Sequence, residues 1–476
     1  MGQEISAVRF EQKDFDFFYK QLNIETEHLK YLIEKQALSE QSPIAGFEVE
    51  AWLLDRGMRP TPSNQLFLEQ LDSSLASAEL AKFNIELNNI PIPLTNEVLR
   101  LLHEDLAQTW QAANQTANQQ NIHLALIGTM PTLEQDQLSL KNMSEMNRYR
   151  ALNEQILNSR GKPIHIDISG KEHLKFDHFD VMLEAATTSF QIHTQVPFPL
   201  AHHYYNASII ASAPLVAIAA NGPYLFGKDL WDETRIPLFE QAIETGGYAG
   251  AAHGPLKRVS FGSGYARESI FECFAENVEH FPILLPIKFE SDPAEFEYLR
   301  LHNGTIWRWN RPLVGFDDDK TPHFRIENRT PAAGPSIVDQ IANAAFYYGL
   351  ANQLTNEIIK NGIPFPFSQA KDNFYQAARH GLNGHIIWQN GEKHRLQSFL
   401  TDHLIPKASQ GLRALQIQPE QIDNYLGIIK HRVRNKQTGA QWQREFIKKH
   451  PNQFRLMMKH YVQHQSSGKP VSEWPL

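Results

Sequence analysis

Residues 46–54 read GFEVEAWLL, and this stretch decides the fold. Three apolar side chains, Phe47, Val49 and Ala51, alternate with Glu48 and Glu50. Because successive side chains of a β-strand point to opposite faces, the stretch predicts a strand with one apolar and one acidic face. The two glutamates would lie about 7 Å apart or less, at a rise of ~3.3 Å per residue. Like charges this close need cations nearby, so the strand predicts a functional site as well as a fold.

The same alternation recurs in three further stretches, FNIELNN at 83–89, SFQIHTQV at 189–196 and HFRIENR at 323–329. A shorter run, PIKFE at 286–290, sets Lys288 and Glu290 against apolar neighbours. An antiparallel sheet with one solvated face is the usual meaning of such a pattern. Solvated strand faces favour Thr, Lys and Ser, however, whereas these carry donors and ligands: Asn84, Glu86, Asn88, Gln191, His193, Gln195, Arg325, Glu327 and Arg329.

This polar face suits a phosphate-bearing ligand held with divalent metals. Mg²⁺ takes carboxylate oxygens and keeps positions for substrate phosphate, and Arg325 and Arg329 beside Glu327 suit the same anion. The chain has no G-x-x-x-x-G-K-[ST] loop, no G-x-G-x-x-G after a strand, no H-E-x-x-H and no G-x-S-x-G. Phosphate chemistry would therefore have to rest on the carboxylate-lined sheet.

Apolar spacing predicts helices at 11–38, 97–119, 145–158, 201–213, 229–244 and 335–361. Beyond Pro364 and Pro366 the chain is expected to be mostly helical. The predicted fold class is α+β, in three segments. Residues 1–43 form a helical lead-in, 44–366 a catalytic domain, and 367–476 a mostly helical C-terminal portion packed on it.

Composition narrows the class of protein. The chain has 476 residues and a formal net charge of −8, with 42% hydrophobic and 21% charged residues, which excludes a disordered chain, a fibrous repeat and a coiled coil. Its mild acidity argues against a nucleic-acid partner. The single cysteine, Cys273, favours a reducing compartment and a packed thiol. The longest apolar run, 207–220, contains Pro214 and is too short to span a membrane, so we expect a cytoplasmic protein.

Two charge runs are less specific. Residues 430–449 hold seven Lys and Arg side chains against Glu445. The commoner reading is the solvated face of a helix, and the alternative is a grip on a nucleotide phosphate. The run DDDK at 317–320 is expected to be an exposed turn.

Taken together, the motifs resemble those of the type-two glutamate–cysteine ligase family, or carboxylate–amine ligases, of the glutamine-synthetase-like superfamily. Eight short motifs stand in the family's order across residues 44–445: GFEVE at 46–50, NIELN at 84–88, GTMP at 128–131, RYR at 148–150, QIH at 191–193, ANGPY at 220–224 with WDETR at 231–235, FRIENR at 324–329 and TGAQWQR at 438–444. Many members have histidine where Met130 stands and serine where Gly222 stands. These departures bear on the identity of the substrates more than on the fold.

The resemblance implies a curved, mainly antiparallel sheet, flanked by helices, whose polar face forms a tunnel for ATP and an acidic substrate. It implies that two or three Mg²⁺ or Mn²⁺ ions are held by Glu48, Glu50, Glu86, His193 and Glu327. Arg235 and Arg329 would contact phosphate or the substrate carboxylate as catalytic residues. Asn88, Arg148, Gln191 and Arg325 are expected to bind substrate.

The function so implied is an ATP-dependent ligase that joins the γ-carboxylate of glutamate to cysteine or another amine through an acyl phosphate. An ATP-dependent phosphotransferase acting on a small amine or guanidine is an alternative, as is a non-catalytic nucleotide- or amino-acid-binding homologue. ATP, a glutamate-like acid and an amine are the expected partners, and the sequence leaves room for a homo-oligomer. The complete set of Glu, His and Arg residues favours the ligase, since a non-catalytic homologue has no reason to keep like-charged glutamates on one face.

Overall fold

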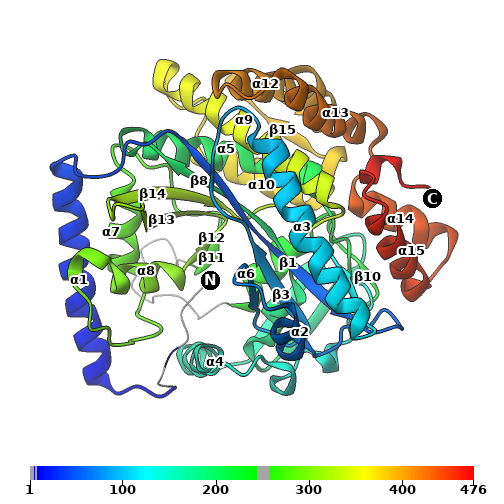
Figure 1. The fold of residues 1–476 in the computed structure, drawn as a ribbon, viewed down its shortest axis with the longest axis horizontal. Coiled ribbons are helices and arrows are strands. Elements are labelled where there is room, and N and C mark those ends of the chain that lie inside the picture. Colours follow the sequence, from blue (N-terminus) through cyan, green and yellow to red (C-terminus); the bar gives the residue numbers. More distant parts are fainter. Residues whose placement is uncertain (1–4, 6–7, 244–256) are drawn as a thin grey trace.

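The computed structural model describes residues 5, 8–243 and 257–476. A curved antiparallel sheet of eight strands runs through the middle of the molecule, and helices surround it (Figure 1). The strand order is β13-β14-β8-β1-β3-β2, and β4 and β5 also pair with β1. The strands are β1 (Ile44–Leu54), β2 (Ala76–Ala78), β3 (Asn84–Asn88), β4 (Ile92–Pro93), β5 (His123–Ala125), β8 (Phe190–Val196), β13 (Asn310–Phe316) and β14 (Pro322–Asn328).

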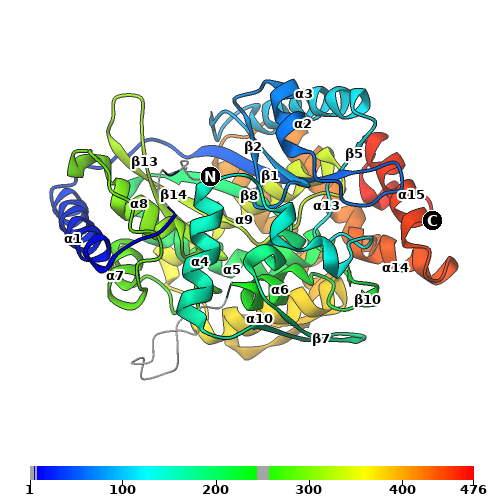
Figure 2. The same cartoon turned by 90° about the horizontal axis from the view of Figure 1, so that it is seen from below.

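The helices follow the predicted pattern, with a long helix at each of the main apolar stripes. They are α1 (Gln12–Glu34), α2 (Asn64–Leu71), α3 (Val98–Gln119), α4 (Asn147–Arg160), α5 (Ala201–Ala219), α6 (Arg235–Ala242), α7 (Phe271–His280), α8 (Glu297–Gly304), α9 (Ile337–Asn361), α10 (Phe367–His380), α11 (Leu396–Phe399), α12 (Ile405–Ala414), α13 (Pro419–Asn435), α14 (Gly439–Lys449) and α15 (Phe454–Ser466). Figures 1 and 2 place α1 at one edge of the molecule and α14 and α15 at the opposite edge. The predicted α+β class with a helical C-terminal portion is confirmed.

Short two-stranded ribbons lie outside this sheet: β6 (Ile164–Ser169) with β7 (His173–His178), β9 (Tyr224–Leu225) with β10 (Lys228–Asp229), β11 (Val259–Ser260) with β12 (Trp307–Arg308), and β15 (His385–Ile387) with β16 (Lys393–Arg395). No helix among the described residues is both long enough and apolar enough to cross a membrane.

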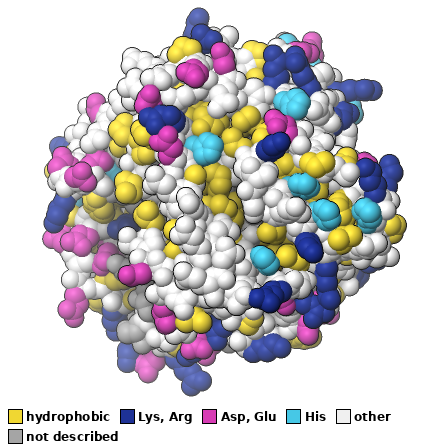
Figure 3. Space-filling view, turned by 45° about the vertical axis from the view of Figure 1, so that its right-hand side comes forward, with side chains coloured by type: hydrophobic (Ala, Val, Ile, Leu, Met, Phe, Trp, Pro, Cys, Tyr) yellow, Lys and Arg dark blue, Asp and Glu magenta, His cyan; other side chains and the backbone are white. Residues whose placement is uncertain are grey.

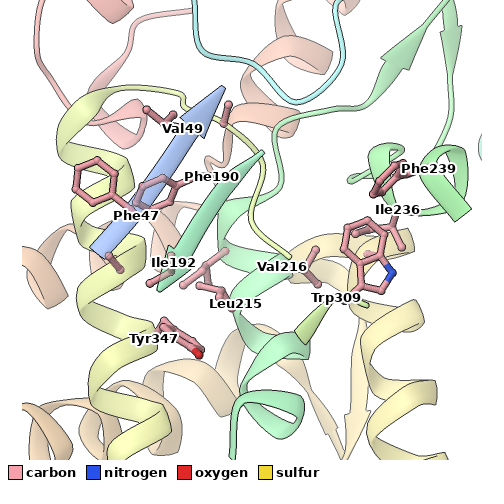
Figure 4. Close-up of a cluster of buried hydrophobic side chains, with 14 of the residues drawn as sticks. Phe47, Val49, Phe190, Ile192, Leu215, Val216, Ile236, Phe239, Trp309 and Tyr347 are labelled. Atoms are coloured by element: carbon pink, nitrogen blue, oxygen red, sulfur yellow. The ribbon is translucent and has the colours of Figure 1, made fainter. Parts of the chain in front are cut away.

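The apolar face of the sheet is buried against the two central helices α5 and α9. Phe47 of β1 and Phe190 of β8 lie side by side with ring centroids 5.5 Å apart, and Ile192 points the same way (Figure 4). Leu215 of α5 and Tyr347 of α9 pack below them (Figure 4). Removal of this surface from water stabilises the sheet, at roughly 25 cal/mol per Å² of apolar area. The opposite, polar face is therefore the side left for a ligand.

Three expectations need correction. Residues 286–290 form no strand; Lys288 instead reaches Asp14 of α1, with Nζ 2.9 Å from Oδ1. The helix expected at 229–244 begins only at Arg235, since Lys228–Asp229 form β10, and residue 244 lies outside the described residues. In the DDDK run, residues 318–320 are exposed, but Asp317 turns inward and bonds Gln195 and His323, each at 2.8 Å.

The basic run 430–449 spans α13 and α14 and is only partly solvated. Arg432 is buried, and its Nη2 lies 2.6 Å from Asp339 Oδ1. Arg444 is buried as well and pairs with Asp229 at 2.7 Å. On the face drawn in Figure 3, charged side chains of both signs are spread over the surface instead of forming one basic patch. Two of the seven cations therefore serve the fold, which leaves the remaining ones for solvent.

One buried polar hub, centred on Asn221, connects α14 and α15 to the rest of the chain. The Asn221 amide donates to Ala333 O at 2.7 Å and to Tyr461 Oη at 2.8 Å, and Gln443 Nε2 donates to Asn221 Oδ1 at 3.1 Å. A Cβ at Gly439 would lie only 2.0 Å from Asn221 Oδ1, so no larger residue fits there. The TGAQWQR motif thus locks the C-terminal portion onto the rest of the chain.

Candidate active site

Strand register brings the predicted polar residues onto one face of the sheet. Glu48 of β1 lies opposite Gln191 of β8, and Glu50 lies opposite Glu86 of β3. His193 lies opposite Glu327 of β14. Cross-strand partners point to the same side of a sheet, so these side chains converge even though they are up to 279 positions apart in the sequence.

The first cluster consists of Glu48, His193 and Glu327. Each offers a ligand atom within 4.8 Å of the others. His193 Nε2 lies 3.5 Å from Glu48 Oε1 and 3.6 Å from Glu327 Oε1. His193 Nε2 and Glu48 Oε2 are buried and have no hydrogen-bond partner among the described residues. Buried polar atoms without partners are costly, so the presence of two of them in one cluster indicates a place for a cation.

The charge states of this cluster follow from its surroundings. Burial, with the nearby carboxylates of Glu86 and Glu327, raises the pKa of Glu48 to about 8. Burial and the guanidinium of Arg325 lower the pKa of His193 well below 6.5, which keeps its imidazole neutral and able to ligate.

The second cluster consists of Glu50, Glu79 and Glu86, again with ligand atoms within 4.8 Å of one another. Glu79 follows β2 directly and was not predicted from the sequence. Burial, followed by the charges of Glu86 and Glu50, raises the pKa of Glu79 well above its ordinary value. Glu184 lies nearby, and burial together with the Glu50 carboxylate raises its pKa to about 8. Burial and mutual repulsion therefore favour protonation of Glu79 and Glu184 when no metal is bound.

Neighbouring polar groups hold the second cluster in position. Ser189 donates its backbone N–H to Glu50 Oε2 at 2.7 Å and its hydroxyl to Oε1 at 2.8 Å. Gln191 Nε2 donates to the same Oε1 at 3.1 Å. Asn88 Nδ2 donates to Glu86 Oε1 at 3.2 Å. Asn88 and Gln191, both predicted to bind substrate, thus orient carboxylates in this structure.

Two arginines flank Glu327. Arg311 of β13, which sequence reasoning missed, donates from Nε at 2.8 Å and from Nη2 at 3.0 Å in a two-pronged pair. Arg329 Nη1 lies 3.3 Å from Glu327 Oε2 and also donates to Gln191. Although burial alone would raise the pKa of Glu327, the two guanidinium groups hold it well below its usual range. Glu327 therefore stays ionised.

Arg235, predicted to be catalytic, lies one step behind this face. Its Nη2 donates to the carbonyl oxygen of Thr330 at 2.6 Å and to that of Arg329 at 3.2 Å. Its Nε lies 3.6 Å from Glu233 Oε1, and its guanidinium stacks on Trp309 at 5.3 Å. In this structure Arg235 holds the backbone that carries Arg329.

The remaining predicted residues lie on either side of the clusters. Arg325 is opposite Gln195 in the sheet, and Glu48 and Glu327 are the carboxylates that act most strongly on its charge. Its Nε is buried with no hydrogen-bond partner among the described residues. Arg148 of α4 donates to Ala78 O at 3.3 Å, close to the second cluster. A cation therefore stands near each cluster, ready for an anionic ligand.

Two surface cavities lie elsewhere. One of about 700 Å³ is lined by Phe226, Phe454 and Arg455, and one of about 430 Å³ by Lys171 and Arg444. Neither includes a residue of the two clusters. The polar face is the stronger candidate because its chemistry, rather than its open volume, is unusual.

The residues present fit divalent metals. Three carboxylates in one cluster, and two carboxylates with a neutral imidazole in the other, offer the hard oxygen ligands of Mg²⁺ and the mixed set that Mn²⁺ accepts. The unpartnered atoms of His193 and Glu48 support this assignment. That these residues are the metal ligands remains a prediction.

Comparison with known proteins agrees with this geometry. The family model for glutamate–cysteine ligase family 2 matches residues 44–469. A glutamate–cysteine ligase from Francisella tularensis, solved in complex with AMP, superposes with a TM-score of 0.54 at 10% identity, covering 92% of this chain and 91% of that one. A bifunctional glutathione synthetase from Pasteurella multocida gives a TM-score of 0.49 at 11% identity, covering 94% of this chain and 54% of that one. No curated protein sequence matches.

The first superposition shows a shared fold, and the family match extends over the whole sheet and both clusters. The chain therefore belongs to glutamate–cysteine ligase family 2.

Proposed function

We propose that this protein is an ATP-dependent carboxylate–amine ligase that joins the γ-carboxylate of a glutamate-like acid to cysteine or another amine. The observation that carries the proposal is the convergence of two carboxylate clusters and several arginines on one polar face. Family membership supports the reaction class, a ligase that forms a C–N bond. We further expect that it acts on small molecules in the cytoplasm.

The chemistry explains why such a face is needed. A carboxylate is a poor electrophile, so it must be activated before an amine can attack. In the proposed first step a carboxylate oxygen of the acid bonds to the γ-phosphorus of ATP, and the bond from that phosphorus to the bridging oxygen breaks to release ADP. In the second step the amine nitrogen bonds to the acyl carbon, phosphate leaves with the former carboxylate oxygen, and the nitrogen loses a proton.

Metals would be held by Glu48, His193 and Glu327 in one cluster, and by the second cluster in the other. When bound, Mg²⁺ or Mn²⁺ would neutralise charge on the phosphate oxygens. Phosphoryl transfer depends on positioning and charge stabilisation more than on covalent chemistry by the protein. The carboxylates therefore need a fixed geometry, which the bonds to Ser189 and Asn88 provide.

The arginines would act on the anion. Arg329 and Arg325 lie beside the first cluster, so they would contact the migrating phosphoryl group and the substrate carboxylate. Arg148 would act at the second cluster. Arg235 would contribute by fixing Arg329, because its Nη1 and Nη2 donate to backbone carbonyls.

The test is a screen for ADP release with glutamate against a panel of amines, with Mg²⁺ or Mn²⁺, followed by product analysis. We expect ADP, phosphate and an amide in equal amounts. A stable phosphorylated product without an amide would instead show a phosphotransferase. Binding of ATP without turnover on any acid and amine pair would contradict the ligase assignment.

A further inference from the structure

Helix α1 lies outside the residues that the family model matches, which begin at residue 44. It runs along one edge of the molecule, beside α7 and α8 (Figures 1 and 2). Phe18, Leu22 and Leu29 bury one of its faces against that edge. The metal clusters need no part of this helix, so its outward face calls for a separate explanation.

That outward face carries an apolar row. Phe17, Ile24 and Tyr31 are 39%, 41% and 53% exposed, and they stand seven residues apart. At 3.6 residues per turn, side chains seven positions apart point in nearly the same direction, so the three form one stripe along the helix. Single exposed hydrophobic residues are common on protein surfaces, whereas three that are aligned along one helix face form an apolar strip that a partner can cover.

A second row, also at seven-residue spacing, runs beside the stripe: Lys13, Lys20, Glu27 and Glu34. All four are exposed. Lys13 contacts Glu11 at 2.6 Å on the surface, and the other three have no ion-pair partner among the described residues. The row is basic in its first half and acidic in its second half.

We propose that α1 docks a second copy of the chain, with the two α1 helices antiparallel about a twofold axis near Ile24. In such an isologous contact residue i meets residue j and j meets i. Ile24 then faces Ile24 of the second copy, and Phe17 faces its Tyr31. Lys20 meets Glu27 of the second copy and Lys13 meets Glu34, each twice by symmetry.

The charge order selects this partner over others. In an antiparallel pair the row of one copy lies against the same row of the other, so that each lysine stands opposite a glutamate, which is favourable. A bilayer with anionic lipids attracts helices whose polar flank is basic, whereas half of this flank is acidic. An antiparallel second copy therefore matches every charge in the row. The inference is independent of the proposed catalytic function.

The experiment measures the association state of the purified full-length chain by sedimentation velocity over a concentration series, with thermal unfolding as a check on folding. We expect the wild type to dimerise. Ile24→Lys places two like charges at the axis and should weaken association by about tenfold or more. Leu66→Lys, at a 52% exposed apolar residue of α2 outside this face, is the matched control and should leave the dimer unchanged.

Charge-reversal variants give a more specific test of the pairing. Lys20→Glu alone and Glu27→Lys alone should each weaken the dimer, and the double variant Lys20→Glu/Glu27→Lys should restore it. These exposed positions lie away from the buried face of α1, so folding should be unaffected. A wild type that stays monomeric at all concentrations would overturn the proposal, and so would a dimer that Ile24→Lys leaves intact. Failure of the double swap to recover association would rule out the antiparallel pairing.

Discussion

Replacing Glu79 with glutamine should stabilise the metal-free protein while impairing its metal binding. The second cluster holds three carboxylates with ligand atoms within 4.8 Å of one another. Two full charges at that separation repel by about 3 kcal/mol at an effective dielectric constant of ~20. Proton uptake limits this cost, because burial and the charges of Glu86 and Glu50 raise the pKa of Glu79 well above its ordinary value of 4.5. Glutamine carries no such cost, so Glu79→Gln should raise the free energy of unfolding by up to about 3 kcal/mol.

The sign of the pH dependence follows from linkage. Because the pKa of Glu79 is raised in the folded state, its stabilising contribution is present below pH 4.5 and is lost as pH rises toward the folded-state pKa. The advantage of Glu79→Gln should therefore be absent near pH 4.5 and grow toward pH 7. In the presence of divalent metal the wild type should be the more stable protein. A metal that binds only the folded state stabilises it, and the variant has lost one metal-binding side chain.

The assay is urea unfolding in EDTA and in saturating Mg²⁺ or Mn²⁺, across this pH range. Glu69→Gln on the exposed surface of α2 removes the same charge far from the clusters and should change neither measurement. A Glu79→Gln protein that is no more stable than the wild type in EDTA, and equally stabilised by metal, would refute the second cluster as a cation site.

Three further predictions concern single side chains. Arg329→Lys keeps the charge but loses the two-pronged donor geometry, so kcat should fall by about tenfold or more with a smaller change in the KM for ATP, whereas an unchanged kcat would place the residue outside the site. His193→Phe should abolish ADP release and His193→Asn should retain part of it, since asparagine keeps a ligand atom. Full activity of the phenylalanine variant would show that His193 is not a metal ligand and that glutamates alone form the metal site. Arg432→Met should destabilise the fold by about 3–5 kcal/mol in urea unfolding, because it leaves Asp339 buried and unpaired, while Arg434→Met on the exposed side of the same helix should have an effect near zero.

Most of the correct predictions came from the alternation of polar and apolar residues in strands. A period of two fixes which side chains share a face, so Glu48 and Glu50 could be placed together without knowing their neighbours. Three other strands were found in the same way, and their polar residues do converge. The same rule failed at Lys288, because alternation over five residues in an irregular segment is indistinguishable from a short strand.

The sequence did not reveal the strand register or the short strands. Which glutamates share a cluster depends on cross-strand partners, and nothing local specifies that Glu50 meets Glu86. Glu79 was missed because β2, with the sequence ASA, contains none of the branched or aromatic residues that mark strands. Arg311 was missed because Pro312 follows it, and proline normally argues against a strand outside sheet edges.

The hub at Asn221 has a consequence for the order in which the protein is made. Its partners Gln443 and Tyr461 are translated more than two hundred residues after Asn221 itself. The backbone of Asn221 accepts from Gly128 and donates to Glu233, the counter-ion of Arg235, so the late partners complete the packing around Arg235. When all the strands of the sheet have been translated, the segment that contains Gln443 and Tyr461 has not yet been made. Nascent chains should gain ligase activity only once the segment through Tyr461 has emerged.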